Sequence, residues 1–261
     1  MCGAAGPAPH RLAESSGDGE LEGIGLAVAA GRYSGLRSAA MSRRTLSVVL
    51  ALALVALAIP AAAYAVITTL SNPADPNATA SCPGTTATPC TVVSRTTAMQ
   101  VKVGNTATPF KVTTAGRLVG WQITLSSPTA AQTKYFDANE GGTSQAAITV
   151  IHQVKALDYK LEYESPLVHL QPYFGQTADF PLASSVAVRP GDVIALTVPT
   201  WVPALELQAG RKAAWRASRN KTQCTSVGVE TAQTAPRSVL QYYCIYRTAL
   251  VDYSAIEIST P

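Results

Sequence analysis

The 261-residue chain has few charged residues and none of the short motifs that mark common catalytic sites. Asp, Glu, Lys and Arg make up 14% of it, and its formal net charge is +4. So small an excess of positive charge does not indicate nucleic-acid binding. The sequence contains no G-x-S-x-G, no H-E-x-x-H, no C-x-x-C and no phosphate-binding glycine loop. We therefore expect no catalytic residue, no metal ligand and no cofactor.

A long uncharged segment stands near the N-terminus. Leu46–Leu70 contains no charged residue, follows Arg43 and Arg44, and passes through Pro60 into an alanine-rich run. A basic start, an apolar centre and an A-x-A end are the parts of a secretory signal peptide, which we place at residues 41–65. The alternative is an uncleaved membrane anchor helix, since the segment is long enough to span a bilayer; Pro60 favours cleavage. Either interpretation predicts a secreted or cell-surface protein.

The segments on either side of this signal have a different composition. Residues 1–40 are rich in Gly, Ala and Ser, and we expect a disordered extension or an error in the assigned gene start, with Met41 as the true start. Residues 66–90 are rich in Thr, Pro and Ala and are expected to form a linker or strap. The remaining chain, 91–261, is expected to be one β-sandwich domain.

Four cysteines follow the signal segment. An even number of cysteines in an exported chain is typical of disulfides, here two, for which three connectivities are possible. We favour Cys82–Cys90, which closes a short Pro/Gly/Thr loop, and Cys224–Cys244, which would join two late strands.

Hydrophobic residues alternate with polar ones through most of the exported part, which is typical of strands. Trp121 is in phase with its apolar strand neighbours and is expected in the core. Arg189–Asp192 has Pro and Gly at the positions that favour a type II turn. Only Ala130–Asn139 indicates a helix. This pattern predicts an all-β fold, an antiparallel β-sandwich of jelly-roll type.

Several stretches of the chain resemble a known group of proteins. They are Gln171–Gln176, Phe180–Leu182, Gly191–Thr197, Pro199–Trp201 and Trp215–Arg219. Together they resemble uncharacterised exported β-sandwich proteins from high-GC Gram-positive bacteria, over about residues 97–253. The resemblance implies the compartment and the fold. The group has no assigned activity, so it implies no mechanism.

The acidic residues and histidines offer little that indicates catalysis. Glu162 and Glu164 lie two apart on a strand and are expected to share its solvent-facing side; a glycosidase would need two such acids across a cleft. His152 is in phase with an apolar strand face, which favours a buried, hydrogen-bonded core histidine. Asp192 follows Gly191 in a turn, where Asp is common for backbone reasons.

A basic segment, Gly210–Lys221, is the strongest candidate for ligand binding. It surrounds Trp215 with basic residues, and no acid occurs between Glu206 and Glu230. Arginine beside an aromatic ring suits an acidic polysaccharide or a phosphate; the alternative is a solvated basic edge that discourages aggregation. Trp201 is either a packing residue or an exposed stacking platform. The candidate ligand-binding residues are Trp201, Trp215, Arg216, Arg219, Arg211 and Lys212.

These features favour an exported, non-catalytic β-sandwich protein, a binding or structural module of the cell envelope. A narrower version is a glycan-binding module for cell-wall or anionic polysaccharide, with no nucleic-acid partner. The membrane would be contacted only through residues 46–70, if the signal is uncleaved. The alternatives are a secreted polysaccharide hydrolase and a subunit of a surface assembly joined through an edge strand.

Overall fold

The computed structural model describes residues 64–72, 78–85, 89–226 and 228–259, all within the compact unit Ala61–Pro261. The predicted extension at residues 1–40, and the signal or anchor segment up to residue 63, lie outside the described residues. Within the described ranges, no helix combines the length and the apolar character needed to cross a bilayer.

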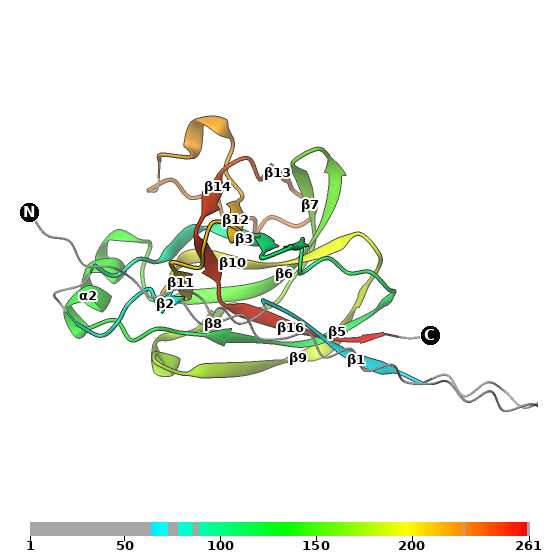
Figure 1. Ribbon diagram of the computed structural model, residues 1–261, viewed down its shortest axis with the longest axis horizontal. Helices are drawn as coiled ribbons and strands as arrows, with labels where there is room; N and C mark the ends of the chain where they lie inside the picture. Colours follow the sequence, from blue (N-terminus) through cyan, green and yellow to red (C-terminus); the bar gives the residue numbers. More distant parts are fainter. Residues whose placement is uncertain (1–63, 73–77, 86–88, 227, 260–261) are drawn as a thin grey trace, which may run out of the picture. The chain divides into compact units, whose positions relative to one another are not determined.

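The first sheet contains four strands and includes the start of the described chain (Figure 1). Its order is β1, β16, β5 and β9, with bounds Val66–Ser71, Tyr253–Ser259, Gly116–Thr124 and Thr177–Val188. β1 pairs with β16 along its whole length. Part of the segment expected to be a linker or strap is therefore an edge strand.

The second sheet is larger and curls back on itself. Its path is β13 (Val239–Gln241), β7 (Asp158–Glu164), β6 (Gln145–Lys155), β10 (Asp192–Val202), β3 (Val93–Val103), β12 (Ala214–Ala217) and β14 (Ile245–Arg247). Two short strands, β4 (Thr106–Ala107) and β8 (Val168–His169), pair with β3 and β6. The end strands β13 and β14 are separated in the chain only by Tyr242–Cys244. Because three residues span only about 10 Å, the two ends of the sheet must approach each other.

The remaining elements are short. A third sheet has the order β15 (Ala249–Val251), β11 (Leu205–Leu207) and β2 (Thr79–Ala80). The predicted helix is confirmed as α2, Ala130–Asn139, and Thr129 and Gln132 form a capping box at its start. Two 3-10 turns, η1 and η2, cover Gln171–Tyr173 and Lys221–Gln223. The pairings between the described strands are antiparallel, so the predicted all-β, antiparallel class is confirmed.

Two local predictions are also confirmed. Gly191 has a φ of +97°, and the Asp192 amide donates to the carbonyl of Arg189, as the predicted turn requires. Trp121 is 1% exposed and belongs to a cluster of buried apolar side chains drawn from both larger sheets.

Both favoured disulfides are present. Cys82 is joined to Cys90 and Cys224 to Cys244, across sequence separations of 8 and 20 residues. Disulfides persist in oxidising compartments and are rare in the cytosol. The pair of them indicates an extracytoplasmic environment for the described part of the chain.

Candidate functional site

The basic segment does not form one continuous surface. Arg211 and Lys212 are exposed ahead of β12, where the Lys212 Nζ donates to Asn105 Oδ1 at 2.8 Å. Arg216 is half-buried, and its Nη1 donates to the backbone carbonyls of Tyr242 and Tyr243 at 3.0 and 2.7 Å. Arg216 thus holds the link between β13 and β14. These three candidates are not gathered at one site.

Trp201 is a packing residue and offers no exposed platform. Its side chain is 0% exposed, and its ring packs against Phe136 and Phe174. Its Nε1 donates to Asp137 Oδ1 and to the carbonyl of Gly142, both at 3.0 Å. The sequence allowed Trp201 to be either a packing residue or an exposed stacking platform. Because the side chain is enclosed, it is a packing residue.

Trp215 and Arg219 lie together, and long-range strand pairing brings Tyr246 to them. β12 pairs with β14 so that Trp215 stands opposite Tyr246, and the two rings stack with centroids 4.5 Å apart. Arg219 is 3% exposed; its Nη1 donates to Tyr246 Oη and its Nη2 to the carbonyl of Ser94, both at 2.9 Å. The hydroxyl of Tyr246 in turn donates to the carbonyl of Cys224 at 3.4 Å. The group is therefore tied to the backbone of Cys224, which forms a disulfide with Cys244.

These side chains border a cavity of about 290 Å³, which we call the Trp215–Arg219 pocket. This volume is at the lower end of the range for small-molecule pockets, roughly 300–1,000 Å³. Arg219 and Arg247 are its charged residues, and no acid occurs among the described residues that line it. Most of the remaining wall is aliphatic, from Val92, Val93, Leu205, Leu207 and Ala249.

Two residues that line this pocket each have an N–H group without an acceptor among the described residues. Neither Arg219 Nε nor Trp215 Nε1 has a hydrogen-bond partner among the described residues, although both atoms are closed to solvent. A buried donor without an acceptor costs about 1–3 kcal/mol, and more when it is charged. An unmet donor on a buried arginine beside a small cavity is an arrangement suited to receiving an anionic acceptor.

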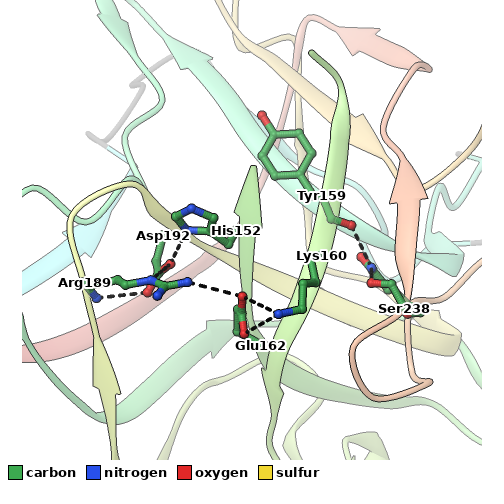
Figure 2. A network of polar contacts seen from close by, with 8 residues as sticks. His152, Tyr159, Lys160, Glu162, Arg189, Asp192 and Ser238 are labelled. Carbon is green, nitrogen blue, oxygen red and sulfur yellow. Dashed lines mark hydrogen bonds and ion pairs between the residues drawn. The ribbon is translucent and has the colours of Figure 1, made fainter. Parts of the chain in front are cut away.

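A separate network of charged residues lies at one end of the larger sheet (Figure 2). His152 Nδ1 is 2.7 Å from Asp192 Oδ1, and Asp192 Oδ2 accepts from the Arg189 amide at 2.9 Å. Glu162 bridges Lys160 and Arg189, with its Oε1 at 3.1 and 3.4 Å from their nitrogens. The network ties the turn after β9 to β6 and β7.

His152 differs from its prediction in one respect. It is hydrogen-bonded, as expected, but its side chain is 30% exposed and pairs with a carboxylate rather than lying in the apolar core. The reason is its place opposite Asp192, close to the end of β6. Glu162 and Asp192 also border a cavity of about 330 Å³, but the contacts of Figure 2 occupy both carboxylates.

Glu162 and Glu164 do not share a face, contrary to expectation. Ile151 of β6 stands opposite Leu161, whereas Val150 stands opposite Tyr163, so Glu162 is the extra residue of a β-bulge. The bulge turns Glu164 to the same side as Leu161, opposite the buried Thr149. Burial raises the pKa of Glu164 from 4.5 to about 7. The two acids therefore cannot act as a pair on one surface of this strand.

No metal centre is found in the described ranges, because no three His, Cys, Asp or Glu side chains come together there. Comparison of the chain with protein-family models, with curated proteins and with solved structures gives no match.

Sequence reasoning identified Trp215 and Arg219 and missed the rest of the pocket. Tyr246 and Arg247 lie on β14, and the aliphatic wall comes from β3, β11, β15 and the segment before β3. These residues meet through the pairing of β12 with β3 and β14 and of β11 with β15. No local sequence pattern predicts such distant pairing.

Proposed function

We propose that the protein is an exported, non-catalytic β-protein of the cell envelope that binds an anionic ligand in the Trp215–Arg219 pocket. The observation that carries this proposal is the pair of buried donors, Arg219 Nε–H and Trp215 Nε1–H, that have no acceptor among the described residues. A bound anion would satisfy them with charge-assisted hydrogen bonds, which are about twice as strong as neutral ones.

Export is supported by two independent features. The uncharged segment after Arg43 and Arg44 has the parts of a signal peptide, and the two disulfides fit an oxidising compartment. We also propose that the two larger sheets are the layers of a jelly-roll-like sandwich. The core cluster shared by both sheets supports this arrangement.

A binding role fits this site better than hydrolysis. The pocket holds no carboxylate among its described lining residues, and a glycosidase requires two. The acids of β7 are turned apart by the bulge. A glycan cannot stack on Trp201, because that ring is enclosed.

The test is retention of the purified protein on isolated envelope fractions, with matched variants. Trp215→Phe keeps a ring against Tyr246 but removes the N–H, and Arg219→Lys keeps the charge but removes the Nε donor. Lys221→Ala is the control, since Lys221 is exposed in the same segment. We expect both pocket variants to weaken retention by about tenfold and the control to match the wild type.

Thermal unfolding of each variant separates loss of binding from loss of fold. If both pocket variants are folded and are retained as well as the wild type, the envelope ligand does not bind in the Trp215–Arg219 pocket. Release of reducing sugar from the same fractions would support the hydrolase alternative instead.

A further inference from the structure

We infer that the group recognised in the Trp215–Arg219 pocket is a carboxylate carried on a small aliphatic body, a deeper assignment that rests on the proposed function. The shared chemistry is that of a short branched-chain acid or of a peptide that ends in an aliphatic residue. The pocket's charge, its free donors and its apolar wall each support this assignment.

The charge of the pocket selects an anion. Arg219 and Arg247 line it without an acid beside them among the described residues. Arg219 is held in place by its bonds to Tyr246 and Ser94, so its orientation is fixed before a ligand arrives. A fixed, buried cation is suited to a single anionic group.

The two donor atoms without a partner and the apolar wall favour a carboxylate over a phosphate. Each Nη of Arg219 donates one of its two hydrogens to a protein acceptor, whereas its Nε–H and the indole N–H of Trp215 have no acceptor among the described residues. Two donors can serve the two oxygens of a carboxylate. A phosphate dianion brings more charge and more acceptor oxygens into the same space, against a largely aliphatic wall that offers them no donor.

The wall of the pocket favours an aliphatic body over a sugar. Five aliphatic residues contribute to it, and the remaining polar side chains are Thr91 and Ser94. A hexuronic acid would place several hydroxyls against this wall, where they lose water without gaining partners. A branched or straight aliphatic chain has no hydrogen bonds to water to lose, and its burial against this wall is favourable.

Entry of the ligand requires a local movement. The two N–H groups are closed to solvent, so an acceptor reaches them only when a side chain of the pocket shifts. Arg247 is exposed while it lines the pocket. It is therefore the cation of the pocket that remains in contact with solvent, whereas Arg219 is 3% exposed.

Calorimetric titration of the purified protein tests the inference. The ligands are isovalerate, its amide, glucuronate, inorganic phosphate, and the tripeptide acetyl-Gly-Gly-Leu with its C-terminal amide. We expect an acid to bind at least about tenfold more tightly than its own amide, because a neutral group does not satisfy Arg219. Trp215→Phe should weaken that acid by about tenfold, and Lys221→Ala should leave it unchanged.

The titrations distinguish between the possible ligand classes. Binding of isovalerate identifies a free acid as sufficient, and binding of the tripeptide alone identifies a peptide end. Equal binding of an acid and its amide overturns the assignment of an aliphatic carboxylate as the ligand, and so does tighter binding of glucuronate or phosphate. Either result leaves the pocket as a ligand-binding site. If no compound binds but the envelope fractions still retain the protein through Arg219, the ligand class is wrong and the proposed function survives. If no compound binds and the envelope fractions do not retain the protein, the ligand class and the proposed function are both wrong.

Discussion

The buried position of Glu164 makes the stability of the protein depend on pH in a defined direction. The bulge at Glu162 turns Glu164 toward buried Thr149, where its Oε1 has no hydrogen-bond partner among the described residues. Burial raises its pKa from 4.5 to about 7 in the folded protein. In the unfolded chain the same carboxyl loses its proton near its ordinary pKa.

The sign of the effect follows from proton binding. Between pH 4.5 and about 7 the folded protein holds a proton on Glu164 that the unfolded chain has lost. Stability therefore falls as pH rises through this range. Converted in full, the rise of this pKa from 4.5 to about 7 corresponds to roughly 3 kcal/mol. Because Glu164 is only half-buried, we expect about 1–2 kcal/mol after allowing for solvent screening.

Urea unfolding of the wild type and of Glu164→Gln at pH 5 and pH 8 measures this effect. The glutamine variant should match the wild type at pH 5 and exceed it by about 1–2 kcal/mol at pH 8. Glu162→Gln is the matched control, an exposed acid of the same strand, and should keep the wild-type dependence on pH. Asp252, whose burial raises its pKa to about 6, contributes equally to both proteins. A variant as sensitive to pH as the wild type would refute the assigned burial of Glu164.

Three further changes test the fold. Replacing Cys224 and Cys244 together by Ser should lower the free energy of unfolding by about 3 kcal/mol in urea; no change would mean that the bridge does not form. Trp201→Phe should cost about 1–3 kcal/mol in thermal unfolding, because the Asp137 carboxylate loses a buried donor, and an unaltered melting temperature would contradict this contact. Asp192→Asn should cost about 1–2 kcal/mol by weakening the turn and its tie to β6, whereas a neutral result would show that the network of Figure 2 adds no stability.

The sequence predicted those features that depend on neighbouring residues. The turn at Pro190 and Gly191 follows from restricted and permitted φ values, and the helix α2 begins at a capping box that Thr129 and Gln132 form locally. The core position of Trp121 follows from period-2 alternation. Disulfide pairing of Cys82 with Cys90 follows from a short loop.

The features that the sequence did not predict depend on distant contacts. The bulge at Glu162 interrupts the alternation that placed Glu164 with Glu162, and its cause lies in the pairing of β7 with β6. The enclosure of Trp201 depends on α2 and on Gly142, neither of which neighbours it in the chain. Arg216 is turned away from Trp215 because successive residues of a strand point to opposite faces, whereas Arg211 and Lys212 precede β12 and Arg219 follows it.

The most direct test of the account is the indole N–H signal of Trp215 in a two-dimensional ¹H–¹⁵N spectrum, assigned by its loss in Trp215→Phe. This donor has no acceptor among the described residues, and under the proposal it gains one from the ligand. Titration with isovalerate, or with the leucine-terminated tripeptide, should move this signal downfield in proportion to saturation and leave the signal of Trp201 in place. A Trp215 signal that stays fixed while calorimetry reports saturation would contradict the assignment of this pocket as the binding site.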